Sequence, residues 1–273
     1  IKENDQYGIL EVGMDKKGEI DYLTKIIEPN VGVITNINYA HAKNFKNLKQ
    51  IALAKSEIIN NIKSNGSIIL NADDKFFRLH KKISQKKNLK LISFGIKSNR
   101  ADIKLTDIKS FGKNFKIQIR FMNNFKYFII SNDYQNNIYN ILSTLAVISV
   151  NLNIFNLNKN IFLNFRIPDG RGDHSIIKIN NKKINLIDQS YNSNPLSLSS
   201  AIKNFDKLKS NKSKKYLLLG DMLELGSYSK KLHESIAPLI NQTKIDKVFV
   251  KGKMASLIYK KILNSKKGKI LSN

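Results

Sequence analysis

The sequence of 273 residues contains no cysteine, no tryptophan and only four prolines. The absence of cysteine excludes disulfide bonds, zinc sites built from thiolates and catalysis by a thiol nucleophile, and it fits a reducing compartment. No apolar run approaches the roughly 20 residues that a membrane-spanning helix requires. The N-terminus also lacks the pattern of a signal peptide. We therefore expect a cytoplasmic protein without a membrane span.

Acidic residues are also few, because 21 Asp and Glu accompany 47 Lys and Arg, for a formal net charge of +26. Such a charge suggests a nucleic acid or another polyanion as partner. Nearly all the excess is lysine dispersed along the chain, however, and arginine, the usual reader of base edges, is rare. We expect no nucleic-acid partner, and a non-catalytic polyanion-binding module is one alternative.

The remaining composition is that of a folded protein. Hydrophobic residues make up 41% of the chain, with 14 Phe and 10 Tyr, which excludes a disordered chain. Strand patterns alternate with helical patterns, an order that is typical of parallel α/β layers. Strands are predicted at 7–14, 31–36, 67–71, 215–220 and 247–250 and within 174–188, and helices at 18–27, 47–62, 136–150, 195–208, 229–241 and 254–263.

Two stretches interrupt this alternation. Residues 101–130 contain three runs of alternating apolar and polar side chains joined by GKN and MNN turns, which predicts antiparallel strands. Residues 166–173, RIPDGRGD, combine Pro, Gly and Asp as a linker does. Because the chain is long enough for two ordinary domains, we expect one at 1–168 and a second α/β domain at 169–273.

Three polar side chains stand near predicted strands, whose ends form the edge at which α/β sheets bind ligands. Glu11 lies within an apolar predicted strand, where a buried carboxylate requires a cation or a hydrogen-bond donor. His41 follows the strand at 31–36, and Lys55 lies among small residues on the next helix. Taken separately, Glu11 suits an ion pair, His41 suits a hydrogen-bonded loop histidine, and Lys55 suits a lysine with a buried stem. Together they suit a shared metal site.

Eight motifs, in one order over nearly the whole chain, resemble those of the Mur ligases. EVGMDKKGEI, VITNINYAH and IALAKSEI are similar to the central domain of that family, and ILNADD, NNIYNILSTLA and DGRGD follow. LIDQSYNSNPLS and LLLGDMLELGSYSKKLHE, which contains Ser229 and His233, resemble the members that add D-alanyl-D-alanine. The Asp-Asn-Pro-Arg motif of the members that add diaminopimelate does not occur.

The resemblance implies an α/β fold with a partial P-loop-type central domain, mainly parallel with an antiparallel portion, and a Rossmann-like C-terminal domain. It implies a monomeric ligase of peptidoglycan synthesis that uses ATP and Mg²⁺. This ligase would join D-Ala-D-Ala to UDP-N-acetylmuramoyl-tripeptide through an acyl phosphate, with release of ADP and phosphate. Folylpolyglutamate synthase, which shares the central fold and this chemistry, is the enzyme alternative.

Family roles carry over to individual residues. Glu11 and His41 match metal ligands, and Lys55 matches the lysine that adds CO₂ to form a carbamate, which requires a neutral amine and is favoured by burial. The resemblance assigns nucleotide contacts to Asn137, Arg171, Gln189 and Tyr191, and substrate contacts to Asn36, Asn192 and Asn194. For the last two, an Asn-rich turn that starts a helix at Pro195 is the structural alternative.

The chain also departs from the family pattern. The phosphate loop ending Gly-Lys-Thr or Gly-Lys-Ser and the uridine-binding domain before it are missing, and the C-terminal domain stops early. The resemblance therefore implies a fragment without ligase activity of its own. The family's Gly-x-His-Asn reads Tyr-Gln-Asn-Asn at 134–137, with Asn136 in place of the histidine. Gln189 replaces an acidic residue, and its amide is still able to hydrogen-bond a ribose hydroxyl.

Overall fold

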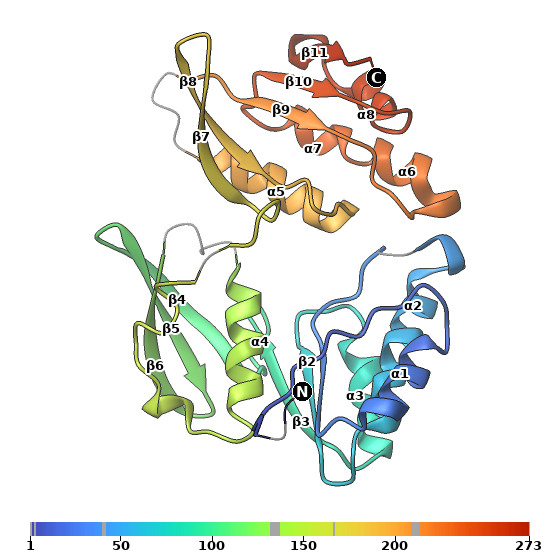
Figure 1. The fold of residues 1–273 in the computed structure, drawn as a ribbon, viewed down its shortest axis with the longest axis vertical. Helices are drawn as coiled ribbons and strands as arrows, with labels where there is room; N and C mark the ends of the chain where they lie inside the picture. The colour runs from blue at the N-terminus through green and yellow to red at the C-terminus, as the bar shows by residue number, and fades with distance from the viewer. Residues whose placement is uncertain are drawn as a thin grey trace.

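Two lobes make up the computed structural model, which describes residues 2, 4–39, 42–131, 137–165, 167–208 and 213–272 (Figure 1). The N-terminal lobe contains one six-stranded sheet in the order β1-β2-β3-β4-β5-β6. Pairing is parallel from β1 to β4 and antiparallel from β4 to β6. The strands are β1 (Val31–Ile34), β2 (Ser67–Asn71), β3 (Lys90–Gly95), β4 (Ile103–Phe111), β5 (Asn114–Phe121) and β6 (Asn124–Ser131), and the helices are α1 (Glu19–Ile27), η1 (Ala42–Asn44), α2 (Leu48–Lys55), η2 (Ser56–Asn61), α3 (Phe77–Lys86), α4 (Ile138–Ile148) and η4 (Ile154–Asn156).

Strand β2 shows that this sheet is buried on both faces. Ile68 and Leu70 belong to a hydrophobic cluster that includes residues of α1 and α2, whereas Ile69 between them belongs to a cluster with α4. All of β2 is buried, as expected for a central parallel strand with helices on both sides. Helices α1 to α3 therefore cover one face of the sheet and α4 covers the other (Figure 1).

The C-terminal lobe has a smaller parallel sheet in the order β11-β10-β9 and a separate antiparallel hairpin, β7–β8. Leu219, Val248 and Val250 of the sheet pack against Ile240 and Ile258 in a separate core. The mixed α/β fold class predicted from the sequence is confirmed. Its elements are β7 (Asp173–Ile179), β8 (Lys182–Asp188), α5 (Pro195–Lys207), β9 (Tyr216–Leu219), η5 (Gly226–Tyr228), α6 (Ser229–Glu234), α7 (Ala237–Asn241), β10 (Lys247–Val250), α8 (Ala255–Lys261), η6 (Asn264–Lys266) and β11 (Lys267–Ile270).

The buried strand predicted at 7–14 is wrong. These residues form no strand, and Tyr7, Ile9 and Leu10 are exposed, Ile9 by 92%. Apolar composition predicted a strand, but a strand also needs a hydrogen-bonded neighbour. In the described part of the chain, β1 is the edge of the sheet and pairs with β2 alone.

Two predicted helices are divided. The helix predicted at 47–62 changes at Lys55 from α2 to η2, and the helix predicted at 229–241 becomes α6 and α7. Pro238 explains the second break, because proline lacks the N–H of a helix interior and fits the first turn, where α7 holds it. Elements α3, β3 and β11 were not predicted. Within the described ranges, no helix is both long and apolar enough to cross a bilayer.

Candidate functional site

Lys55 is the last residue of α2, at the point where this helix gives way to the tighter 3-10 helix η2. Its side chain is half-buried. Desolvation lowers the pKa of the Lys55 ammonium, while the nearby carboxylates of Asp74 and Glu11 act in the opposite direction. Because the net pKa is lowered, a larger fraction of Lys55 is the neutral amine, the form that reacts with electrophiles such as CO₂.

The two carboxylates near Lys55 differ from the sequence-based expectation. Glu11 is exposed rather than buried in a strand, and it reaches the neighbourhood of Lys55 from an unpaired segment. Asp74, which was not selected from the sequence, has the larger electrostatic effect on Lys55. Its carboxylate is held near the end of β1, because Asp74 Oδ2 accepts the Ile37 N–H at 2.8 Å. Its place directly after a predicted strand is the signal that could have found it.

His80 is a further titratable group beside Lys55. Its side chain is 2% exposed, and Nε2 lies 3.0 Å from the carbonyl oxygen of Ala52, one helical turn before Lys55. Desolvation lowers the pKa of His80, the Ala52 hydrogen bond and Asp74 act against that, and Lys55 lowers it further. A neutral ring that donates from Nε2 therefore ties α3 to the last turn of α2. The lysine-rich sequence around His80 gave no signal of this burial.

The residues around Lys55 fit a divalent cation only in part. Glu11 and Asp74 offer carboxylate oxygens, the hard donors that Mg²⁺ prefers. Among the residues that the structure describes, no group of three or more His, Cys, Asp and Glu side chains could hold a metal ion. His41, the second predicted ligand, lies outside the described residues, as does Asn136. His41, or Lys55 in the carbamate form that the resemblance implies, would be the further protein ligand.

Asp73 joins three elements at the same end of the sheet. Its carboxylate accepts the backbone N–H groups of Ile96, Lys97 and Ser98 at 2.6, 2.9 and 2.7 Å, after β3, and the hydroxyl of Tyr139 on α4 at 2.9 Å. Burial alone raises the pKa of Asp73, but these hydrogen bonds outweigh it and hold the pKa below its ordinary value. Burial and the contact with Asp73 together raise the pKa of Tyr139.

Three predicted nucleotide contacts lie together where the linker meets the segment after β8. The guanidinium carbon of Arg171 is 4.3 Å from the ring centre of Tyr191, and the Tyr191 N–H donates to the Gly170 carbonyl at 3.1 Å. Gly172 has a φ of 104°, and a Cβ there would lie 2.6 Å from Nε2 of Gln189. The exposed Arg171–Tyr191 stack offers a planar cation and an aromatic face, which suit phosphate and base, respectively.

The predicted asparagines have different surroundings. Asn36 and Asn192 are exposed, whereas Asn137 is half-buried at the start of α4 and accepts from Asn140 Nδ2 at 3.2 Å. Asn194 Oδ1 accepts the N–H groups of Leu196 and Ser197 at 3.0 Å each, in a capping box that starts α5, and Asn38 Nδ2 at 2.6 Å. The helix-starting turn therefore forms, and Asn194 also joins the two lobes.

Comparisons with known proteins give matches in both lobes. Residues 1–148 match the family described as Mur ligase middle domain, and residues 175–272 match the Mur ligase, glutamate ligase domain. A UDP-N-acetylmuramoyl-tripeptide--D-alanyl-D-alanine ligase of Rickettsia prowazekii is 31% identical, over 100% of this chain and 60% of the relative. The enzyme of the same name from Buchnera aphidicola subsp. Baizongia pistaciae is 33% identical, over 98% of this chain and 56% of the relative.

Solved structures show the same fold. MurF from Acinetobacter baumannii superposes with a TM-score of 0.84 at 23% identity, over 99% of this chain and 56% of that protein. Folylpolyglutamate synthase from Thermotoga maritima superposes with a TM-score of 0.57 at 18% identity, over 90% of this chain and 55% of that protein. The chain thus spans somewhat more than half the length of the relatives it matches.

Proposed function

This chain belongs to the Mur ligase family, and from that premise we propose that the full-length gene product joins D-Ala-D-Ala to UDP-N-acetylmuramoyl-tripeptide. The observation that carries the proposal is that relatives at 31% and 33% identity bear the name of this ligase and align with nearly the whole chain. We propose a cytoplasmic, monomeric enzyme with domains at 1–168 and 169–273.

The proposed reaction activates a carboxylate, which is by itself a poor electrophile. A carboxylate oxygen of the tripeptide attacks the γ-phosphorus of ATP, the bond to the β–γ bridging oxygen breaks, and ADP leaves. The amine of D-Ala-D-Ala then attacks the acyl carbon. Phosphate leaves with the former carboxylate oxygen, and the nitrogen loses a proton to give the amide. Both steps concentrate negative charge, so the site must supply positive charge and hold the reactants in line.

Lys55 has the central role among the residues of this chain. Its ammonium group first loses one proton to give the neutral amine. The amine attacks CO₂, an N–C bond forms and a second proton is released, so that the side chain ends as an anionic oxygen donor. Glu11, His41 and this carbamate would hold Mg²⁺, which when bound neutralises phosphate charge. The lowered pKa of Lys55 supports this role. His80 and Asp74 would keep the end of α2 in place.

The remaining assignments extend this proposal across both lobes. The stack of Arg171 on Tyr191 supports a nucleotide site that closes over the phosphates at the linker. Gln189 and Asn137 would contact the ribose and the adenine, respectively. Asn36, Asn192 and Asn194 would contact the substrates, and for Asn194 the amide nitrogen is the available group, because its oxygen accepts the hydrogen bonds that start α5.

The test is nucleotide turnover by the purified full-length gene product. We expect ADP and phosphate only when ATP, UDP-N-acetylmuramoyl-tripeptide and D-Ala-D-Ala are all present, together with a product of the summed peptide mass. L-Ala-L-Ala is the matched control and should give no product. Turnover with tetrahydrofolate and glutamate instead would refute the proposal and favour the folylpolyglutamate synthase alternative, whose fold is also similar.

A further inference from the structure

The loop that connects β9 to α6, residues 221–228, is fixed to the core of the C-terminal lobe, and we call it the docking loop. Met222 and Leu225 are 2% and 1% exposed within that core. The Met222 N–H donates to Nε2 of the buried His233 at 2.9 Å, and His233 Nδ1 lies 2.7 Å from the Ser229 carbonyl oxygen. These two contacts assign the proton of His233 to Nδ1. The histidine thus holds both ends of the docking loop.

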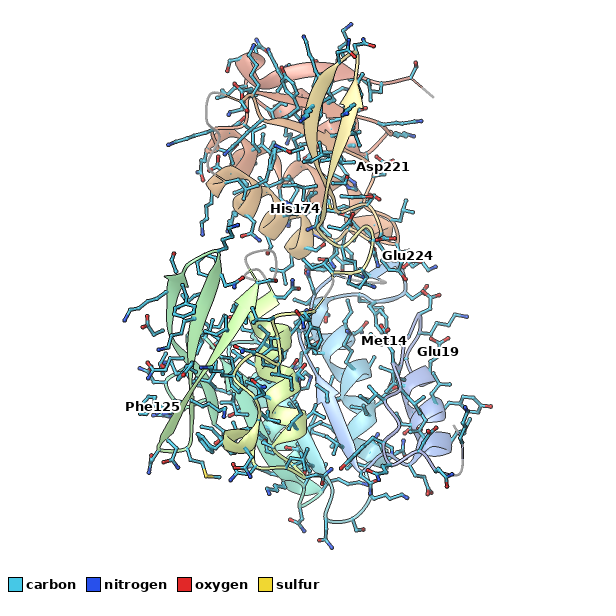
Figure 2. All side chains as sticks on the ribbon, turned by 60° about the vertical axis from the view of Figure 1, so that its left-hand side comes forward. Met14, Glu19, Phe125, His174, Asp221 and Glu224 are labelled. Carbon is cyan, nitrogen blue, oxygen red and sulfur yellow. The ribbon has the colours of Figure 1, made fainter. Side chains whose placement is uncertain are left out.

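The backbone of the docking loop is strained as well as anchored. Asp221 Oδ1 accepts the N–H of Ala255, the first residue of α8, at 2.7 Å. Glu224 and Gly226 have φ values of 59° and 54°, a left-handed conformation that is unfavourable for Glu224. Figure 2 shows Asp221 within the upper lobe and Glu224 where it faces the lower lobe. The loop therefore presents a preformed shape to the N-terminal lobe.

The docking loop meets Tyr39 and residues 42–46 of the N-terminal lobe, which we call the acceptor segment. The Lys43 N–H donates to the Glu224 carbonyl at 3.0 Å. A Cβ on Gly226 would lie 2.6 Å from Lys43 Cα, so the two backbones approach more closely than any side chain at Gly226 would allow.

One tyrosine from each lobe also packs across this contact. Tyr39 packs against the core of the C-terminal lobe, and Tyr228 packs against a core of the N-terminal lobe. The two ring centres are 5.3 Å apart, within the range of favourable aromatic pairs. The Tyr228 hydroxyl also donates to the Lys46 carbonyl. Aromatic side chains that fill pockets across an interface dominate its energy.

The acceptor segment is equally well anchored in its own lobe. Ala42 and Phe45 are 1% and 7% exposed in the N-terminal core. Asn44 Nδ2 donates to the carbonyl of Asp15 at 2.9 Å, and Lys43 Nζ lies 3.4 Å from Asp15 Oδ1. The acceptor segment therefore connects the docking loop to the chain that leads from Glu11.

We propose that Gly226 and Tyr228 are positioning residues, through which the C-terminal lobe fixes the acceptor segment when the lobes adopt this arrangement. In the sequence, Tyr39 and Lys43 lie on either side of Ala40 and His41. The docking loop contacts the chain on both sides of that pair, through the ring of Tyr39 and the backbone N–H of Lys43. The catalytic part of this inference rests on the proposed function of His41, whereas the docking does not. GDMLELG would then serve to set the lobe arrangement rather than to bind substrate.

The test compares alanine substitutions at two glycines with similar positive φ values, 54° at Gly226 and 60° at Gly112. Gly226→Ala introduces a methyl group against Lys43, whereas Gly112→Ala, at a φ of 60°, meets nothing within 4 Å. Because the chain has no cysteine, spin labels on Lys82→Cys of α3 and Lys260→Cys of α8 report the distance between the lobes. We expect Gly226→Ala to shift or broaden the distance distribution and Gly112→Ala to leave it unchanged.

Tyr228→Phe is the second variant, because it removes only the hydroxyl that contacts Lys46. It should also shift or broaden the distance distribution, and it tests the docking if Gly226→Ala does not fold. A parental distance distribution in every folded variant would overturn the docking. In the full-length enzyme, we expect Gly226→Ala to lower kcat by roughly 10-fold with KM for ATP unchanged. A changed distance with parental kcat would overturn the positioning role alone. The distance measurement stands even if the proposed ligase activity fails.

Discussion

Replacing Lys55 with alanine in the full-length enzyme is expected to lower the ligation rate by roughly 100- to 1,000-fold, the usual cost of removing a charged group that stabilises a transition state. The reason is that the proposed carbamate would supply an anionic oxygen ligand, which alanine lacks. Lys55→Arg should be equally inactive, because arginine keeps its positive charge and does not add CO₂. Initial rates of product formation at saturating substrates measure both effects.

Chemical rescue separates this role from a structural one. Acetate or formate should restore part of the activity of Lys55→Ala by occupying the vacated anionic position, and should have no effect on Lys55→Arg. Lys49→Ala is the matched control, because Lys49 is an exposed lysine on the same helix and its loss should change stability by less than about 0.5 kcal/mol. Near-parental rates for Lys55→Arg would remove the carbamate from the mechanism.

The second large effect concerns stability. Asp73→Ala is expected to lower the free energy of unfolding of this chain by about 2 kcal/mol, because it leaves three N–H groups after β3, two of them in part-buried hydrogen bonds, without their acceptor. Asp107→Ala is the control, since the pair of Asp107 with Lys109 at 2.7 Å lies at the surface, where solvent screening leaves such a pair with little effect on stability. Urea unfolding followed by circular dichroism measures both changes.

The effect of Asp73 should depend on pH with a defined sign. Hydrogen bonds hold its folded pKa below the ordinary value, so the carboxylate stabilises the fold above the unfolded pKa of about 3.9. That contribution is lost as the pH falls through the lower folded pKa. The difference between parent and Asp73→Ala should therefore be full above about pH 5 and shrink below about pH 3. A difference that does not vary with pH would show that Asp73 acts through packing alone.

Periodicity in the sequence predicted the strands whose pairing partners are their neighbours in the sequence. The three antiparallel strands within 101–130 form as predicted, because alternation and turn residues specify a hairpin without help from distant segments. The strand at 7–14 failed because pairing depends on a neighbour that the periodicity does not reveal. The change from α2 to η2 at Lys55 was also missed by periodicity, which is nearly the same for the two helix types, and the hydrogen bond of His80 with Ala52 lies one turn before this change.

Residues of the candidate site to which the family motifs assign a role were predicted from the sequence, whereas the others were not. Lys55, Arg171 and Tyr191 followed from the family resemblance, and the last two stack in the structure. Asp74 acts to raise the pKa of Lys55, and Lys55 acts to lower the pKa of His80. These residues lie on elements that are separate in the sequence, so spacing alone did not reveal them. His41 stays a prediction, because it lies outside the described residues.

Transfer of an oxygen isotope tests the proposed ligase chemistry most directly. The full-length enzyme would be supplied with ATP, D-Ala-D-Ala and UDP-N-acetylmuramoyl-tripeptide that carries ¹⁸O in its reacting carboxylate, and the products would be examined by ³¹P NMR and mass spectrometry. Attack of that carboxylate on the γ-phosphorus predicts one ¹⁸O atom in the released inorganic phosphate and none in ADP. Recovery of the label in AMP, with pyrophosphate as the second product, would mean activation by adenylation and would contradict the acyl-phosphate account.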